Sequence, residues 1–368
     1  MRAAFKSPKE AGLFMLLLLL LLASPWLAGK RFIPDREQAY LGQGSSFGPF
    51  PWIHHQIFDE SSAIDIAFVG SSHLLCGIDT PYVQQKLSDE LGQNKVVRTI
   101  CWGGSDFDAL YFITKDLLEK RKVKMLVFTD ESVGQFHNNA LIPAWFRYGD
   151  NFADLDGLPA TEKLPYYFAS IVGLPRNLVC RLRTNLPADM LASNYCQEYY
   201  QTTNPACRLG SVSSQRAFIF SIFEKRPPFS PFKPATGIQP GETCIYSAAT
   251  KTNFAFLNEQ LPAWQLFFAQ RFCALAQQHG CKLVLMHMPV LADAQKSKIE
   301  EKQFWPETLQ ADIAIVGIPP QNLFRGLADS QVKELFSDIV HLNQNGQNFF
   351  TPIVTPALIN LYEKCVPH

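Results

Sequence analysis

The sequence predicts an α/β protein in which helices cover both faces of a five-stranded parallel sheet. Short runs of apolar and β-branched residues alternate with longer segments whose apolar residues recur at helical spacing. This alternation occurs before and again after an irregular central stretch. Because neighbouring parallel strands are joined by right-handed crossovers through a helix, the expected architecture is a three-layer α/β sandwich.

The first half contributes three strands and two helices. Residues 64–69 form an apolar run rich in β-branched residues, which suits a buried strand, and Pro81 stands at an early helical position. The elements expected in chain order are a strand at 64–69, a helix at 81–91, a strand at 96–101, a helix at 106–120 and a strand at 124–128.

The second half repeats this rhythm. Gly280 ends a helical segment, and two apolar, strand-like runs each stop at a proline. The last helix contains Pro352 and Pro356 and is therefore expected to be kinked or broken. The elements expected here are a helix at 258–279, strands at 282–288 and 311–318, and a helix at 344–364.

The amino-terminal segment differs from the rest of the chain. Residues 11–29 carry no charge and include seven consecutive leucines, 16–22. As a helix this stretch reaches roughly 28 Å, about one hydrocarbon thickness. It is interpreted as an uncleaved, single-pass membrane anchor or a signal peptide. The anchor is favoured because Pro25 and Trp26 interrupt the nearest small-residue cleavage site. Either places the body outside the cytoplasm.

These patterns divide the chain into five segments. The central one is rich in proline and aromatic residues and is expected to pack over the carboxyl ends of the strands, either as a lid or as a decorative loop region. The segments are an anchor or signal at 1–30, a linker at 31–62, the first half of the domain at 63–140, a large irregular insertion at 141–250 and the second half at 251–368.

Composition excludes some classes of partner. The 368 residues include 33 basic and 33 acidic side chains, so the charge offers no broad attraction to nucleic acid. The cysteine and histidine spacings match no zinc site, and neither a metal nor a cofactor is expected. The central cysteines can form disulfides, and those in apolar segments are expected to be buried thiols. The two sets are Cys180, Cys196, Cys207 and Cys244, and Cys76, Cys101, Cys273 and Cys281.

Ser72 stands where the first strand gives way to helix. A serine hydroxyl is a weak nucleophile until a base takes its proton, and that base needs a third group to hold its ring. Gly70 allows a tight turn, and the N-terminal dipole of a following helix would stabilise negative charge. The alternative is an ordinary polar loop that closes a buried strand.

Asp338 and His341 follow the fifth strand, three residues apart. At this spacing the carboxylate can accept a hydrogen bond from the imidazole, although a surface pair or a helix cap would show the same pattern. The carboxyl ends of parallel strands open onto one edge of the sheet. We therefore expect Ser72 to meet this pair there.

Two glycines follow the second strand in "CWGGSDF". Acyl transfer through a serine develops an oxyanion that needs preorganised donors. The backbone amide of Gly104, or alternatively of Gly103, is the candidate donor together with that of Ser72, and a plain tight turn is the competing interpretation. "GSSFG" at 44–48 is a decoy, because no strand and helix flank Ser46.

Five further histidines are alternative candidates for the base. His287 ends a strand and is expected near the site. His54, His55, His73 and His137 are interpreted as ordinary structural or surface residues.

The order of these motifs resembles that of the SGNH (GDSL-type) hydrolase superfamily. The segments "VGSSHLLCGID", "IAIVGIPP" and "DIVHLNQNGQNFF" are similar to membrane-anchored SGNH proteins of bacterial envelopes, the group that includes D-alanyl transfer and alginate O-acetylation proteins. The resemblance covers about 63–140 and 250–366. It implies a flavodoxin-like sheet, with Ser72 as nucleophile, Asp338 and His341 as the closing dyad, and Gly104 as the second-block glycine.

One block departs from the family pattern. Where the superfamily has Gly-x-Asn-Asp after the third strand, this chain has "VFTDES" without an asparagine. Thr129, Asp130 or a displaced Asn138 or Asn139 would have to supply the missing oxyanion donor. An acidic group aimed at an oxyanion is unfavourable, so Thr129 and Asn138 are the candidates.

The resemblance implies a serine esterase or O-acyltransferase that acts on O-acyl groups of an envelope or exported polysaccharide. The protein would be held at the membrane by its first helix, and a multi-pass acyltransferase would be its partner. Two alternatives remain open. One is a non-catalytic envelope protein of the same fold that binds glycan or such a partner, and the other is a lipid esterase.

Overall fold

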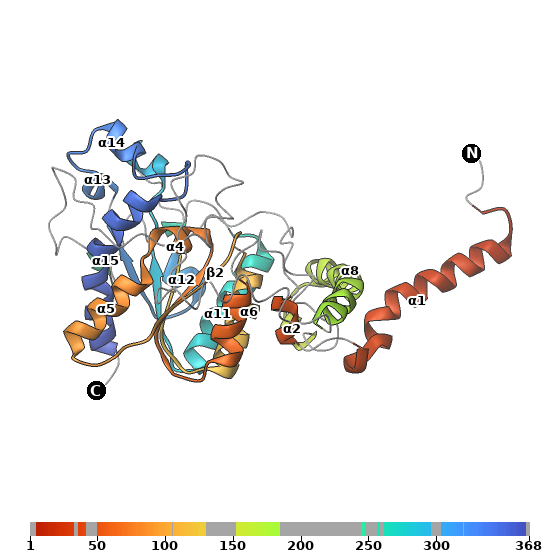
Figure 1. Ribbon diagram of the computed structural model, residues 1–368. Coiled ribbons are helices and arrows are strands. Elements are labelled where there is room, and N and C mark those ends of the chain that lie inside the picture. The colour runs from red at the N-terminus through yellow and green to blue at the C-terminus, as the bar shows by residue number, and fades with distance from the viewer. Residues whose placement is uncertain are drawn as a thin grey trace. The chain divides into compact units, whose positions relative to one another are not determined.

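The computed structural model describes residues 5–32, 36–41, 50–104, 106–129, 152–184, 244–246, 256–257, 261–295, 303–318 and 320–365. The chain forms two compact units, which are described separately here (Figure 1). Unit 1 comprises Met1–Gln43 and His137–Met190, and unit 2 comprises Gly44–Phe136 and Leu191–His368. Asp130, His137, Asn138, Asn139, Ser46, Cys196 and Cys207 lie outside the described residues.

Unit 1 is helical. Its helices are α1 (Pro8–Phe32), α2 (Arg36–Leu41) and α8 (Ala160–Thr184), with a 3₁₀ turn, η3 (Phe152–Leu155), and α8 packs against both α1 and α2. Most large side chains from Leu13 to Leu22 are exposed. Within the described residues, no helix combines the length and the apolar character needed to cross a membrane. The anchor stays a prediction.

The sequence pattern did not predict α8. This helix lies inside the stretch 141–250, which was expected to be irregular. Pro165, Gly173 and Pro175 interrupt its pattern, and residues of these types normally disfavour helix interiors. The helix nevertheless buries Tyr166 and Ser170. Packing therefore decides its conformation where local propensity does not.

Unit 2 contains a six-stranded sheet in the order β2-β1-β3-β6-β8-β4. The first five of these strands pair in parallel, which confirms the predicted five-stranded parallel sheet. The sixth, β4, was not predicted and pairs antiparallel with β8. The bounds are β1 Ile64–Gly70, β2 Val97–Cys101, β3 Val123–Thr129, β4 Cys244–Tyr246, β6 Lys282–Met286 and β8 Ile313–Gly317.

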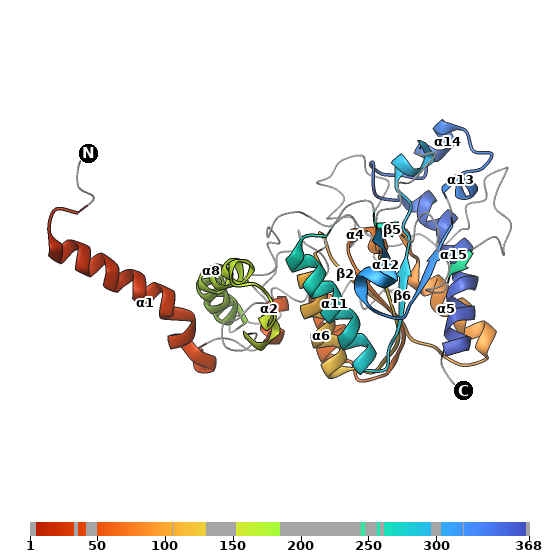
Figure 2. The ribbon, with the colours of Figure 1, turned by 180° about the vertical axis from the view of Figure 1, so that it is seen from behind.

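Helices cover both faces of this sheet, so unit 2 is a three-layer α/β sandwich (Figures 1 and 2). Helices α5 (Thr80–Leu91) and α15 (Gln344–Cys365) lie on one face, and α6 (Phe107–Lys120) and α11 (Ala263–Gln278) lie on the other. All seven residues of β1 are buried, as expected for a strand covered on both sides. The shorter elements are α3 Phe50–His54, η2 His55–Asp59, α4 Ser72–Gly77, β5 Phe256–Leu257, η6 Leu291–Gln295, β7 Gln303–Phe304, α12 Trp305–Leu309, α13 Pro320–Leu323 and α14 Asp329–Lys333; β5 and β7 form a separate two-stranded pair.

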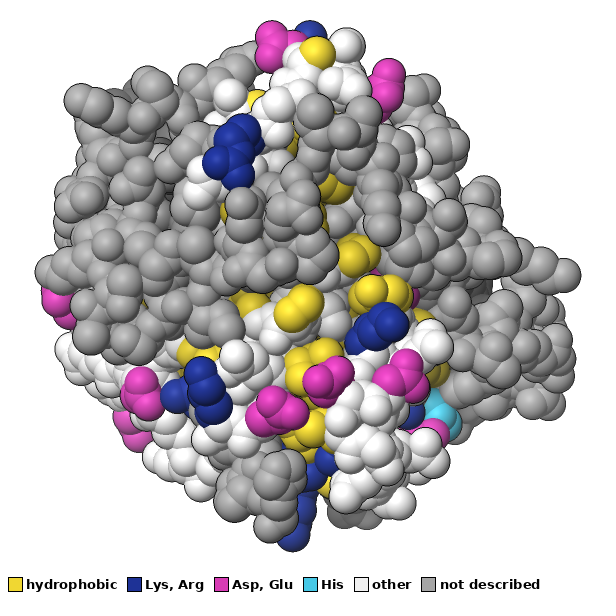
Figure 3. All heavy atoms as spheres, turned by 90° about the vertical axis from the view of Figure 1, so that its left-hand side faces the viewer, with side chains coloured by type: hydrophobic (Ala, Val, Ile, Leu, Met, Phe, Trp, Pro, Cys, Tyr) yellow, Lys and Arg dark blue, Asp and Glu magenta, His cyan; other side chains and the backbone are white. Residues whose placement is uncertain are grey.

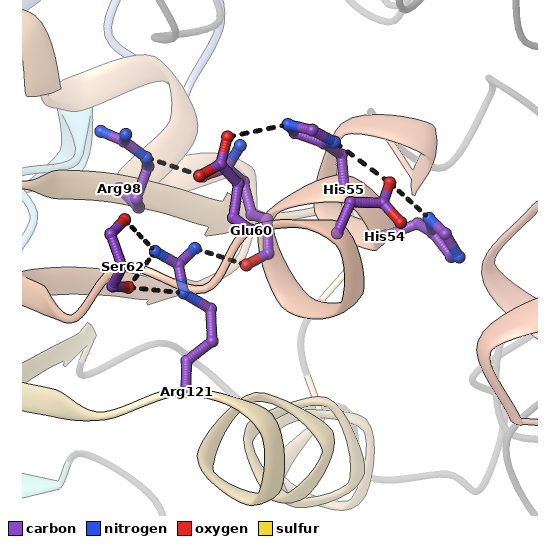
Figure 4. A network of polar contacts seen from close by, with 8 residues as sticks. His54, His55, Glu60, Ser62, Arg98 and Arg121 are labelled. Carbon is purple, nitrogen blue, oxygen red and sulfur yellow. Dashed lines mark hydrogen bonds and ion pairs between the residues drawn. The ribbon is translucent and has the colours of Figure 1, made fainter.

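The segment before β1 is part of the core of unit 2. Residues 31–62 were expected to be a linker, yet α3 and the π-helical turn η2 bury Ile53, Gln56 and Ile57. Arg121 donates to the Gln56 carbonyl at 2.5 Å and also to that of Ser62 (Figure 4). Burial, together with the charge of neighbouring Arg98, lowers the pKa of Arg121 to about 10. The segment is therefore fixed by buried polar contacts that apolar periodicity cannot reveal.

Helix α15 is unbroken, although it contains two prolines. Each proline lacks the N–H that would bond four residues back, which led us to expect a kink or a break. The Thr355 hydroxyl donates to the Thr351 carbonyl at 2.7 Å, and Phe350, Val354 and Leu358 bury one face of the helix. Packing thus maintains the helix through both prolines, and the expectation of a break was wrong.

A groove runs along α5 and α15 on the face shown in Figure 3. The described part of this face mixes apolar with charged side chains. The groove has a volume of about 330 Å³ and is lined by Tyr82, Lys86, Glu90, Pro352, Thr355, Pro356, Ile359, Asn360 and Glu363. None of these residues follows a sheet strand, so the groove is not at the carboxyl edge where the site was predicted.

Three buried hydrogen bonds join α15 to the region between α4 and α5. The Asp79 amide donates to Thr351 Oγ1 at 3.0 Å, and the Thr351 hydroxyl donates to the Gly77 carbonyl at 3.3 Å. Gln347 Nε2 donates to the Ile78 carbonyl at 3.2 Å. Both Thr351 and Gln347 are buried. These bonds fix the start of α15 relative to the end of α4.

A second polar cluster fixes the far end of α15. Asp65 of β1 accepts from Lys124 of β3 at 2.9 Å and from the Tyr362 hydroxyl, and its other oxygen accepts from the Val96 amide at 2.8 Å. Burial would raise the pKa of Asp65, but these hydrogen bonds and the Lys124 charge outweigh burial and lower it. The same contacts raise the pKa of Lys124.

Replacing Thr351 by valine removes the hydroxyl while keeping the shape of the side chain. The Asp79 amide then loses this acceptor at a buried position, so the free energy of unfolding should fall by about 1–3 kcal/mol. Urea unfolding of the full-length chain, followed by tryptophan fluorescence, measures the change. Thr355→Val is the matched control, because this equally buried hydroxyl bonds within α15 and its loss should cost less. Equal losses would contradict the role given to Thr351.

Acid should remove the stability that the Asp65 cluster provides. The pKa of Asp65 is lowered in the folded protein, so its contribution is fully present above about pH 4 and is lost as the pH falls through the lowered pKa. In urea unfolding, the stability difference between wild type and Asp65→Asn should therefore shrink from about pH 6 to about pH 3. Asp312→Asn is the control, because its pair with Lys282 is exposed and contributes less than about 1 kcal/mol. A difference that does not depend on pH would refute the assignment.

Candidate functional site

Ser72 lies just beyond the carboxyl end of strand β1, which pairs with β2 and β3. The strand ends at Gly70, Ser71 caps the following helix by accepting the His73 amide at 3.0 Å, and Ser72 is the first residue of α4. Gly70 is close-packed, since a Cβ there would lie 3.2 Å from Leu74 Cδ1. The strand-to-helix turn predicted from Gly-Ser-Ser is therefore present, and it sets Ser72 at the edge of the sheet.

Asp338 and His341 lie on a tight loop between α14 and α15. Phe336 and Leu342 form an antiparallel bridge, and the Ser337 amide donates to the His341 carbonyl at 2.9 Å. The two arms of the loop are thus paired directly beside the dyad. This pairing fixes the backbone on which both side chains are carried.

Hydrogen bonds at the start of α15 hold the same loop. The Asn343 amide donates to the Leu335 carbonyl at 2.9 Å, and Asn343 Oδ1 accepts the amides of Asn345 and Gly346 at 2.8 and 3.1 Å. A Cβ on Gly346 would lie 2.1 Å from the Leu335 carbonyl oxygen. Only glycine permits this approach of the helix to the loop.

The structure brings Ser72, His341 and Asp338 into one line. Ser72 Oγ lies 2.9 Å from His341 Nε2, and His341 Nδ1 lies 2.7 Å from Asp338 Oδ2. Ser72 is 8% exposed and the His341 side chain 15%, so the pair is largely shielded from bulk water without being sealed. The expected meeting of a serine near the beginning of the chain with a histidine near its end is therefore observed.

The hydrogen-bond partners assign the protonation of His341. An ionised carboxylate can only accept, so the Nδ1–H of His341 donates to Asp338. In a neutral ring, Nε2 is then unprotonated and accepts from the Ser72 hydroxyl. This is the tautomer that a base acting on Ser72 requires.

Asp338 is held in its ionised form. Its Oδ1 accepts the amides of Val340 and His341 at 2.8 and 2.7 Å, while Oδ2 faces the imidazole. Burial alone would raise the pKa of Asp338, but the hydrogen bonds from the His341 ring and these two amides outweigh burial and lower it. The carboxylate is thus charged and oriented at neutral pH.

Gly103 and Gly104 follow β2, the strand that neighbours β1. Gly70 is in register with Cys101, and the Trp102 amide donates to the Gly70 carbonyl at 3.0 Å. Gly104 has φ of +82° with open space where a Cβ would be, so its backbone favours glycine. Both glycines thus lie at the same edge of the sheet as Ser72.

Thr129 is the described candidate for the missing third block. It is the last residue of β3, is buried, and its Oγ1 lies 3.9 Å from the position of a Cβ on Gly70. Its hydroxyl is therefore close to the turn that carries Ser72. The other candidate, Asn138, lies outside the described residues.

Two residues near the site, His73 and Ile339, were missed or undervalued in the sequence, and a third, His287, was expected near it. The ring of His73 packs against that of His341, with centroids 5.1 Å apart and planes at 81°. Ile339, between the two members of the dyad, is 72% exposed. His287 Nε2 lies 3.6 Å from Asp293 Oδ2, and the next turn bonds to the dyad loop, from the Leu291 amide to the Ile339 carbonyl at 3.0 Å. Adjacency to Ser72 was visible for His73, but ring contact requires the tertiary structure.

Other nucleophiles and ligands in the described part of the chain do not compete with this site. Cys76, Cys101, Cys273 and Cys281 are buried, as predicted. Burial raises the pKa of Cys273 to about 12 and that of Cys281 to about 11, so both stay protonated at neutral pH. Among the described residues, no group of three or more histidine, cysteine, aspartate or glutamate side chains is arranged to hold a metal ion.

Comparison with known proteins gives no relative. No protein-family model matches the chain, and searches of curated proteins and of solved structures found no similar protein. The function is therefore inferred from the geometry of Ser72, His341 and Asp338.

Proposed function

We propose that the protein is a serine-dependent acyl esterase or O-acyltransferase that forms an acyl-enzyme on Ser72. The observation that carries this proposal is the line of hydrogen bonds from Ser72 Oγ to His341 Nε2, at 2.9 Å, and from His341 Nδ1 to Asp338 Oδ2, at 2.7 Å. A nucleophile, a base and an orienting carboxylate in this order are what acyl transfer through serine requires.

In the first half of the reaction, His341 Nε2 takes the hydroxyl proton while Ser72 Oγ attacks the carbonyl carbon of an ester. The carbonyl electrons move onto oxygen, where the amides of Ser72 and Gly104, or alternatively Gly103, are the proposed donors. Thr129 is the proposed hydroxyl donor in place of the family's asparagine. The carbon–oxygen bond to the alcohol then breaks, and the alcohol takes the proton from the His341 imidazolium.

In the second half, water or a sugar hydroxyl gives its proton to His341 Nε2 and attacks the acyl carbon. The bond to Ser72 Oγ breaks, and Oγ takes the proton back. Water yields hydrolysis, and a sugar hydroxyl yields O-acyl transfer. Asp338 remains ionised throughout and stabilises the imidazolium that forms in each half.

The strand order supports an SGNH-type fold. Taken alone, the five parallel strands follow the order second, first, third, fourth, fifth, which is that of flavodoxin-like sheets, whose ligands bind beyond the carboxyl ends of the strands. Ser72 stands at that edge, just beyond the end of β1. The motifs of Ser72 and of Gly103–Gly104 follow β1 and β2, and the Asp338–His341 motif precedes the last helix, α15, which is the order proposed from the resemblance.

The proposed substrate is an O-acyl group of an envelope or exported polysaccharide. This follows from the resemblance of the motifs to membrane-anchored SGNH proteins. The uncharged residues 11–29 support a single-pass anchor, with the body on the extracytoplasmic side and a multi-pass acyltransferase as partner.

A fluorophosphonate probe tests the nucleophile. Wild type should be labelled, and Ser72→Ala should lose labelling completely because the attacking oxygen is gone. Ser88→Ala on α5 is the control and should label like wild type, since that hydroxyl bonds to the Gln84 carbonyl within its helix. A folded wild type that stays unlabelled favours the non-catalytic glycan- or partner-binding alternative.

Faster turnover of long-chain than of short-chain p-nitrophenyl esters, without activity on acetylated xylan, favours the lipid esterase.

Asp338→Asn should keep the shape of the loop but reverse the ring tautomer. The amide NH₂ would face His341 Nδ1, so Nε2 would carry the proton and could no longer accept from Ser72. A fall in kcat/KM for p-nitrophenyl acetate of roughly 1,000- to 10,000-fold is expected. The exposed Asp312→Asn serves as control. A loss below about tenfold would show that Asp338 does not orient the base.

A further inference from the structure

A second imidazole lies against the base. His73 directly follows Ser72 in α4, and its ring meets that of His341 at a centroid distance of 5.1 Å and an interplanar angle of 81°. This is an edge-to-face arrangement, which aromatic rings favour over a face-to-face sandwich. The contact therefore has a preferred geometry and restricts how the two rings turn relative to each other.

The tilt of the His341 ring is set by its two side-chain torsions, χ1 and χ2. Asp338 holds Nδ1 and Ser72 holds Nε2, so two hydrogen bonds restrain these two torsions. Loss of either bond leaves the tilt of the ring less restrained. The contact with His73 is a further restraint on the same ring.

His73 is itself held by the element that carries the nucleophile. Its amide donates to Ser71 Oγ at 3.0 Å in the first turn of α4. The far end of α4 is bonded to α15 through Gly77 and Thr351. His73 and Ser72 thus belong to the same short helix, and His341 belongs to the loop before α15.

We propose that His73 is a positioning residue that fixes the tilt of the His341 imidazole, and that it matters most in the acyl-enzyme. This inference rests on the proposed function. Once Ser72 is acylated, its hydroxyl no longer bonds to Nε2, so the ring loses one of its two hydrogen bonds, while the Asp338 bond and the contact with His73 remain. Without that contact, His341 should activate the incoming water or sugar hydroxyl less well.

Burst kinetics with p-nitrophenyl acetate test this step. His73→Ala should slow deacylation by about 10- to 100-fold while slowing acylation less, so that a burst of p-nitrophenol precedes a slower steady state. His73→Phe keeps a ring at this position and should return deacylation to within about threefold of wild type. The control is His279→Ala, since that side chain is exposed beyond the end of α11. Unchanged deacylation in His73→Ala, or a His73→Phe variant as slow as His73→Ala, would overturn the proposal.

Proton NMR separates this inference from the proposed function, because it needs no turnover. The proton shared by His341 Nδ1 and Asp338 should give a low-field resonance in wild type and in His73→Phe, and a broadened or lost resonance in His73→Ala. A sharp resonance in His73→Ala would refute the positioning role even if the fluorophosphonate labels Ser72. A wild type that is not labelled but shows the expected loss in His73→Ala would refute the enzyme and leave the ring contact supported.

Discussion

The hydroxyl of Thr351 bonds helix α15, near the end of the chain, to the segment that follows Ser72. Ser72 and His341 are 269 residues apart in sequence, and each lies on a short element that has little rigidity of its own. Thr351 bonds α15 to the backbone of Gly77 and Asp79, beside the end of α4. The 2.9 Å contact between hydroxyl and imidazole therefore depends on this buried junction as well as on the paired loop that carries His341.

Helix α15 acts as a rigid support because both of its ends are fixed. Its first turns bond to the region between α4 and α5, and Tyr362 near its other end bonds to Asp65 of β1. Near the amino end of β1 the strand itself is bonded to α15, and beyond its carboxyl end the segment after α4 is bonded to α15. The strand that leads to Ser72 and the helix that follows the His341 loop are thus held together at both ends. Gly346 completes this arrangement by letting the helix pack directly against the Leu335 carbonyl of the loop.

The parts of the structure that follow from local periodicity were predictable from sequence. The buried run before Gly70 and the helix after Asp79 gave element bounds close to those observed, and a parallel sheet then brings Ser72 and His341 to one edge. Elements held by tertiary contacts were not predictable. Helix α8 contains residues that break helices, the 50–59 segment is fixed by Arg121, and β4 has only three residues. The His73 contact was hidden for the same reason, because two ring planes meet only after folding.

Strand β4 has a consequence beyond the site. Without it, β8 would present a row of unpaired amide and carbonyl groups along the side of the sheet, and such a row is a template on which a second molecule can add its own strand. The antiparallel pairing from Cys244 to Tyr246 occupies those groups, and a strand of three residues is itself too short to recruit another. The segment 141–250, which looked irregular in the sequence, thus supplies the strand that covers this edge of the sheet and keeps a second molecule from pairing with β8.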